Sequence, residues 1–421
     1  MSSKSRRRPP PALPAELWIS ILDLALQHLS PLERIRTMDS SSFLLDGYDP
    51  LDERHFMRFI KVRDRPSHRA ASAHGVLKTV HSLGRVCRLW HQLSQELAYQ
   101  TVRLDTRRWK SLCAALDDTE RSVAPWIRSI MLSTTRFDHN MQMLQQPAFC
   151  DTLEAVLQPE FPRNEAIYAP EKGVVLPPLR NLRWIFWVDT HWSHSSLESV
   201  LAASAPNIQH IVLASSRTIG PESNRDRIRI PSTGLPRLET LAIERVTGLQ
   251  ADTILGARLP NLTELTLHPM HLLMTPEAYD PILSLRTLTL IDRPISKVYI
   301  SCTAIRARFP ALKELRFDAC STFRLPEKPF TQLVCVHLLL PVEPPLNVFP
   351  AIANLPLLRD HAAFGALERV VLSGKGWGYL RQPKMMTELK EVEDMKAAKG
   401  TRREIRVESR DGREWTLDRI G

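Results

Sequence analysis

The chain has 421 residues, of which 43% are hydrophobic, and a formal net charge of +10. This apolar content is enough to fill a folded interior, so the composition excludes an intrinsically disordered protein. No run of about 18 apolar residues is present, so we expect no transmembrane helix and no membrane partner. The N-terminus has no signal-peptide core, which predicts a protein of the cytoplasm, the nucleus or both.

Residues 1–11 form a basic tail that we expect to be disordered. Its cluster of Lys4 and Arg6–Arg8 is of a kind found in nuclear-import signals and nucleic-acid contacts, but a solvated tail is the more common interpretation. Elsewhere the arginines are dispersed among acidic residues, and no basic stripe is interleaved with aromatic residues. Nucleic acid is therefore not the partner that we expect.

Two amphipathic helices are predicted in residues 12–104, which we assign to a small all-α domain. The first begins near Leu13, followed by a proline that suits the first helical turn. The second, at about 80–99, has apolar residues at three- and four-residue spacings. A polar insertion at about 30–78 separates the two helices. The strand-like segment 101–104 is expected to cap the repeats that follow.

The pattern apolar-x-x-apolar-x-apolar recurs nine times in residues 105–421. The copies begin at Ile127, Leu182, Ile208, Leu238, Leu262, Leu285, Leu312, Leu333 and Leu367. From the second copy onward the mean step is about 26 residues, within the range of leucine-rich repeats. One copy is too short to bury its apolar face alone, so neighbouring copies must stack into a continuous core. We therefore predict an α/β fold, a leucine-rich-repeat solenoid with a curved parallel sheet and helical or irregular outer returns.

The segments between the copies are predicted to be these returns, with examples at 141–157, 195–203, 276–285, 296–309 and 351–358. Proline phrases stop the returning segment before several copies, at 205–207, 235–237, 259–261 and 309–311. The gap between the first and second copies is about two periods long, and it holds either a degenerate repeat or an insertion. Residues 404–407 and 414–417 are predicted to form a β-hairpin that caps the far end.

Two segments before the repeats match a known motif. Leu13-Pro14-Ala15-Glu16-Leu17, with Ile21, resembles the opening of an F-box, and Val86-Cys87-Arg88-Leu89-Trp90 resembles its closing helix. The whole chain resembles fungal-type F-box proteins with a leucine-rich-repeat domain. This resemblance implies a noncatalytic adaptor, whose F-box binds the Skp-type linker of an SCF (cullin–RING) ubiquitin ligase while its repeats bind a protein substrate. The linker contacts carried over by position are Leu13, Pro14, Leu17, Ile21, Val86, Cys87 and Trp90.

The chain departs from the family pattern in two places. The insertion at about 30–78 is longer than the loop that an F-box usually has, although closing a long surface loop costs little entropy. The Asn or Cys expected three positions after the last apolar residue of each repeat strand occurs only at Cys320. Its absence elsewhere predicts irregular turns and uneven curvature.

The residues between the apolar positions of a repeat strand are expected to face the concave side of the sheet. Our candidates for binding a substrate there are Trp184, Phe186, Val188, His210, Glu264, Glu314 and Arg316. Trp184 and Phe186 stand out because exposed aromatic residues are typical interface anchors. An insertion or a tail that covers these two rings is an equally good interpretation.

The local sequence indicates no catalytic grouping, no cofactor motif and no metal site, so we predict that the protein is not an enzyme. The six cysteines are scattered without a Cys-x-x-Cys pair, which favours neither a disulfide framework nor a zinc ribbon. His191 and His194 are three residues apart, but no further metal ligand is near them in the sequence.

Two other functions stay open at this level. One is a repeat scaffold for protein interactions, whose degenerate F-box serves only as an N-terminal cap. The other is a basic nuclear factor that contacts nucleic acid through Lys4 to Arg8. Failure to bind a Skp-type linker would favour the scaffold, and salt-dependent binding that is lost with the basic tail would favour the nuclear factor.

Overall fold

The computed structural model describes residues 99–104, 109–117, 123–132, 137–158, 174–188, 194–214, 229–244, 254–268, 280–291, 299–318, 322–340, 357–358, 362–374 and 406–409. The main feature of this part of the chain is one twelve-stranded parallel sheet, which confirms the α/β class. Its strands, in spatial order, are β1 (Thr101–Arg103), β2 (Ser129–Met131), β3 (Ala155–Gln158), β4 (Trp184–Val188), β5 (His210–Ala214), β6 (Thr240–Glu244), β7 (Glu264–Leu267), β8 (Thr287–Leu290), β10 (Glu314–Asp318), β12 (Cys335–Leu340), β13 (Arg369–Gly374) and β14 (Arg406–Ser409).

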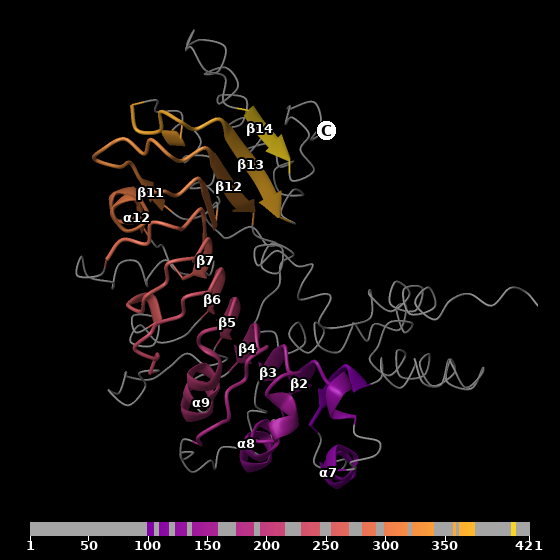
Figure 1. The fold of residues 1–421 in the computed structure, drawn as a ribbon. Coiled ribbons are helices and arrows are strands. Elements are labelled where there is room, and N and C mark those ends of the chain that lie inside the picture. Colours follow the sequence, from indigo (N-terminus) through magenta and orange to yellow (C-terminus); the bar gives the residue numbers. More distant parts are fainter. Residues whose placement is uncertain are drawn as a thin grey trace, which may run out of the picture.

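The order of the strands in space follows their order in the chain. Two further strands, β9 (Tyr299–Ser301) and β11 (Thr322–Arg324), pair with each other in a separate parallel sheet. Figure 1 shows the main sheet following an arc, with its strands along the inner side and β11 beside α12 (Cys302–Arg308) on the outer side. Each unit therefore packs mainly on the units immediately before and after it.

Each of the nine copies of the apolar pattern overlaps one strand, and the nine strands are β2, β4–β8, β10, β12 and β13. The two-period gap contains a degenerate repeat. Leu153 and Val156 occupy the first two apolar positions of this unit, while buried Gln158 occupies the third, and the unit forms β3. The prediction of a helical or irregular return at 141–157 is therefore wrong only for residues 155–157, because the polar residue at the third position concealed the strand.

The second apolar position of every copy builds the centre of the core. In-register pairing stacks these residues on one another from strand to strand, and they form the row Ile130, Val156, Ile185, Ile211, Leu241, Leu265, Leu288, Leu315, Val336 and Val370. Each of them is 2% exposed or less. Because this row is continuous from strand to strand, the apolar residues that a single unit could not bury alone are buried between neighbouring units.

A fourth apolar position precedes each of these copies by three residues. It is occupied by Ala124, Leu179, Ala205, Leu235, Leu259, Ile282, Phe309, Phe330 and Phe364, all of which are buried. In the proline phrases this residue starts a turn, and the Leu238 amide donates to the Leu235 carbonyl at 3.2 Å. Gly234, at φ 71°, precedes this turn, and a Cβ there would lie 2.5 Å from the Arg258 carbonyl oxygen of the next unit.

Main-chain hydrogen bonds also repeat along the array, at the point where each strand begins. The amides of Gln209 and His210 both donate to the Arg183 carbonyl, each at 2.9 Å. The next unit repeats this arrangement, in which Glu239 and Thr240 donate to the Gln209 carbonyl. One carbonyl therefore serves two consecutive amides of the next unit, so both of these amides have a partner where the strand starts.

Helices and turns connect the strands, and the described ones are α7 (Trp109–Asp117), η2 (Ala124–Trp126), α8 (Phe137–Leu144), η3 (Pro147–Phe149), α9 (His194–Ser204) and α12. The return predicted at 195–203 is confirmed as α9, which buries Leu197, Val200 and Leu201 against the core. In α12, the Ser301 hydroxyl accepts a hydrogen bond from the Ala304 amide and caps the helix. Arg306 and Arg308 in the last turn suit the negative end of its dipole.

The two ends of the sheet are β1 and β14. β1 pairs with β2, as expected of a segment that caps the array, and β14 runs parallel to β13. The predicted second arm of the C-terminal hairpin, 414–417, lies outside the described residues, as does the helical domain up to residue 98. No helix among the described residues is long and apolar enough to cross a bilayer.

Candidate binding face of the sheet

The candidate site is the face of the sheet that points away from the core, which we call the front face. Side chains alternate along a strand, so residues on either side of a core position share this face. Figure 1 places the strands on the inner side of the arc, with α8 and α9 outside, so the front face is the concave one. Its first row contains Trp184, His210, Thr240, Glu264, Thr287 and Glu314, which are all in register. All six are partly exposed.

The first cluster on the front face is made by Trp184, His210 and Thr240. The rings of Trp184 and His210 stack with their centroids 3.7 Å apart and an angle of 18° between their planes. The Nδ1 atom of His210 shares a hydrogen bond of 2.6 Å with the Thr240 hydroxyl. Burial lowers the pKa of His210 from its usual 6.5 to about 4, so the ring is neutral at pH 7. The cluster thus offers a partner a rigid, uncharged aromatic platform.

The second row of the front face is more deeply buried than we expected. Phe186 is 6% exposed, so the prediction that it is an exposed anchor is wrong. Its in-register neighbours Leu157 and Val212 flank the ring on both sides. Further along the row, Thr266 and Thr289 are buried. Val188 ends β4, but its side chain lies outside what the structure describes.

The second cluster is polar and spans β10 and β12. The Arg316 Nε atom donates to Glu314 Oε1 at 2.8 Å, and the His337 Nε2 atom lies 2.6 Å from the same oxygen. Burial on its own raises the pKa of Glu314, but the hydrogen bonds from His337 and Arg316, with their charges, outweigh it and lower the pKa from its usual 4.5 to about 2. Glu314 therefore stays ionised at neutral pH, held by two neighbours.

Sequence reasoning missed two members of this cluster, Cys335 and His337. They lie between the apolar positions of the copy that begins at Leu333, by the same rule that selected Glu314 and Arg316 from the preceding copy. Parallel pairing sets Cys335 opposite Glu314 and His337 opposite Arg316. The signal was therefore in the pattern, but the interaction depends on a register that no local window of sequence contains.

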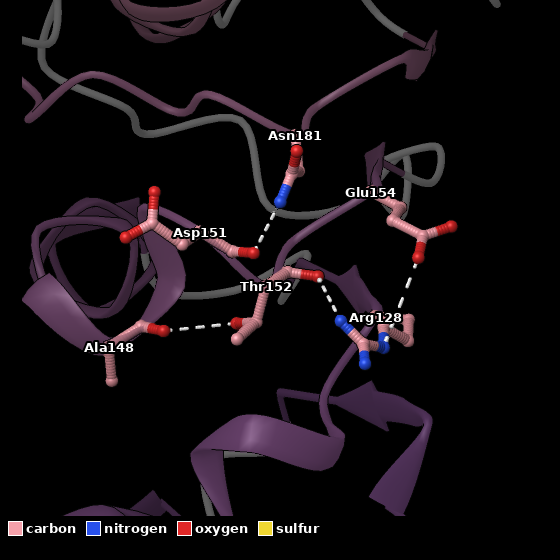
Figure 2. A network of polar contacts seen from close by, with 6 residues as sticks. All are labelled: Arg128, Ala148, Asp151, Thr152, Glu154 and Asn181. Atoms are coloured by element: carbon pink, nitrogen blue, oxygen red, sulfur yellow. Dashed lines mark hydrogen bonds and ion pairs between the residues drawn. The ribbon is translucent and has the colours of Figure 1, made fainter.

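A third polar network lies at the entry edge of β2–β4 (Figure 2). The guanidinium of Arg128 reaches the Thr152 carbonyl at 3.5 Å and the Glu154 carboxylate at 3.9 Å. The Asn181 side-chain amide donates to the Asp151 carbonyl of the preceding unit. Arg128, Asp151 and Asn181 are exposed, and Thr152 and Glu154 are partly exposed. We therefore assign this network to the alignment of neighbouring turns and not to binding.

The residues predicted to contact a Skp-type linker are not placed by the structure. Leu13, Pro14, Leu17, Ile21, Val86, Cys87 and Trp90 all lie outside the described residues. The same is true of Cys320, of His191 and of the side chain of His194. Among the other cysteines, Cys113, Cys150, Cys302 and Cys335 are described, and none of these four is in a disulfide.

Comparison with known proteins adds no family to this description. No model of a known protein family matches the chain, and no curated protein matches it significantly. The described part of the chain offers an in-register parallel sheet with two separate side-chain clusters on its front face.

Proposed function

We propose that the protein is a leucine-rich-repeat adaptor that binds a protein substrate on the front face of its sheet and delivers it to an SCF-type ubiquitin ligase. The observation that carries this proposal is the order of the main sheet, in which twelve parallel strands follow one another in chain order. Such an array presents an extended surface that suits a macromolecule better than a small substrate.

The repeat assignment is supported by the period and by the burial of the pattern. The copies recur about every 26 residues, and the second apolar residue of each is buried in one continuous row. Side-chain amides that stand one position before two of the copies bond to the preceding unit. Asn261 donates its side-chain amide to the Pro236 carbonyl at 2.7 Å, and Asn181 makes the equivalent bond one position before its own repeat.

The adaptor role is supported by the resemblance of two N-terminal segments to the halves of an F-box, around Leu17 and Trp90, in the right order before the repeats. A small helical bundle of this kind cannot bury all its apolar residues internally, so part of its surface needs a partner. The Skp-type linker is the partner that the resemblance implies. The front face would then bind the substrate, with Trp184 as its aromatic anchor.

The test is capture of the intact chain by a purified Skp-type linker. We expect binding, and we expect Leu17→Asp and Trp90→Asp each to reduce it at least about tenfold, because a charge in an apolar contact is left without a partner. Leu283→Asp is the matched control, since Leu283 is 66% exposed on the array and tolerates a charge. No capture of the intact chain, or equal capture of all three variants, would refute the adaptor role.

A specific contact favours the scaffold as the second candidate. Tyr99, at the end of the predicted second helix, packs partly buried against the core, with its ring centroid 6.3 Å from that of Trp126. An N-terminal segment anchored in this way would also serve as a cap for the array. In this case Trp90→Asp lowers the stability of the array, and the linker does not bind even the unchanged chain.

A further inference from the structure

The register of β10 and β12 brings three different metal-binding groups to one point on the front face. Cys335 pairs directly with Glu314, and His337 follows two residues later on the same face of the same strand. The Glu314 carboxylate, the Cys335 thiol and the His337 imidazole each offer one ligand atom, and these atoms all lie within 4.8 Å of one another. Two neighbouring strands, held by main-chain hydrogen bonds, therefore position the whole set.

We propose that Glu314, Cys335 and His337 bind a zinc ion that bridges β10 and β12. Thiolate, imidazole and carboxylate are all established zinc ligands, and the combination of sulfur and nitrogen selects against calcium and magnesium, which prefer oxygen. Three protein ligands leave one position of a tetrahedron open for water or for a side chain of a bound partner. The proposal does not depend on the adaptor role.

Small movements of side chains would complete the site. Ligand atoms around one tetrahedral zinc ion lie about 3 to 4 Å apart, given zinc–ligand bonds of about 2.0 to 2.3 Å. His337 Nε2 and Glu314 Oε1, now 2.6 Å apart in a hydrogen bond, must separate by about 1 Å or less. Binding breaks this hydrogen bond, and the proton that His337 Nε2 donates to Glu314 must leave that nitrogen, for Nδ1 or for solvent, before it can ligate zinc. The thiol proton of Cys335 is also released to solvent, since sulfur binds zinc as the thiolate.

Arg316 opposes the ion and sets the affinity. Its Nε atom holds Glu314 Oε1 at 2.8 Å, so the guanidinium competes for the same carboxylate that the zinc ion needs. Its positive charge also lies close to the position of the incoming ion, where the half-buried surroundings screen it less than water does. Removing this charge should therefore strengthen metal binding.

Cobalt(II), which substitutes for zinc and absorbs visibly when a thiolate binds it, is the probe. The full-length chain, stripped with a chelator, is titrated with cobalt and the bound metal is then displaced with zinc. We expect one equivalent of cobalt to bind per chain and to show a thiolate-to-cobalt charge-transfer absorption band. Cys335→Ser should abolish this absorption, and His337→Gln should weaken binding at least about tenfold. Cys150→Ser is the control, because that thiol belongs to a turn outside the sheet and should leave the spectrum unchanged.

Arg316→Gln keeps the test independent of folding, because misfolding would separate Glu314, Cys335 and His337 and weaken this site, whereas the proposal expects tighter binding. We expect about tenfold tighter cobalt binding from this variant, in line with the loss of one nearby charge. No thiolate absorption from the intact chain would overturn the proposal. The same absorption after Cys335→Ser would also overturn it, and would show that the metal binds at another cysteine.

Discussion

At the scale of the residue, the pKa of His210 is set by its surroundings, which include side chains from the two adjacent strands. It stacks on Trp184 from β4 and bonds to Thr240 from β6, so its imidazole is enclosed on both sides within one row. Desolvation of the ring disfavours the imidazolium form and lowers the pKa of His210 to about 4. The ring therefore acts as a polar aromatic group and not as a cation at physiological pH.

We expect this shift to make folding stability depend on pH. The unfolded chain takes up a proton near the usual pKa of 6.5, while folded His210 does so only near 4, so the unfolded state binds more protons between these values. Stability attributable to His210 is thus full above pH 6.5 and is lost as the pH falls through 4, by about 1 to 3 kcal/mol after allowance for solvent screening.

Histidine titration by NMR measures the His210 pKa directly, and urea midpoints for the intact chain and His210→Gln at pH 7 and pH 4.5 measure its effect. Gln cannot titrate, so the variant should lose less stability over this interval. A pKa of 6.5 or higher would contradict the prediction. It would show that the cation–π attraction of the Trp184 face outweighs the desolvation.

At the scale of the element, the repeat unit has four apolar positions and not the three of the pattern that we recognised first. The additional position, occupied by Phe309 in the unit that contains β10, starts the turn before each strand and is buried. The turn is closed by a main-chain hydrogen bond, in which the Leu312 amide donates to the Phe309 carbonyl at 3.2 Å. This position is readable from sequence, because it stands immediately before proline in several copies.

Phe309→Ala should lower the free energy of unfolding by about 3 to 5 kcal/mol, the usual cost of truncating a buried phenylalanine. Leu283→Ala is the matched control, because Leu283 lies beside the equivalent position of the preceding unit but is 66% exposed. We expect this control to change stability by no more than about 0.5 kcal/mol. Urea unfolding followed by circular dichroism measures both, and equal effects would refute the four-position unit.

At the scale of the whole molecule, the array depends on having both neighbours for every unit. The central core row passes through ten of the twelve strands, from β2 to β13, and no single unit closes it. Cutting the chain after residue 318 would remove β11, β12, β13 and β14 and leave β10 as an unprotected edge of the main sheet. The apolar residues Leu315 and Phe317 would then lose their in-register neighbours Val336 and Leu338.

A chain that ends at 318 should therefore expose apolar surface and aggregate, because parallel edges without a cap pair with other chains. A chain that ends at 409 keeps all twelve strands and is the control. Dye binding to exposed apolar surface and size-exclusion chromatography distinguish the two. If the shorter chain elutes as a single species and binds no more dye than the control, the array does not need its terminal units.

Some units can be predicted from the sequence and others cannot. The strand of the copy beginning at Leu262 can be predicted, since three apolar residues at fixed spacing must share one buried face. The unit that forms β3 was concealed because Gln158 stands at the third position, and only its buried neighbours identify it. Phe186 was expected to be exposed but is 6% exposed, and its register opposite Leu157 and Val212 cannot be read from its own strand.

The sequence by itself determined the repeated strands and their turns and the set of residues on each face, because these depend on local periodicity and on proline. Only the tertiary structure decided which side chains meet. Glu314 and His337 are more than twenty residues apart in the chain, and they touch because main-chain pairing places β10 beside β12 in one register. The local pattern specifies which side chains of a strand face the core. The stacking of all the strands specifies which side chains of other strands lie beside them.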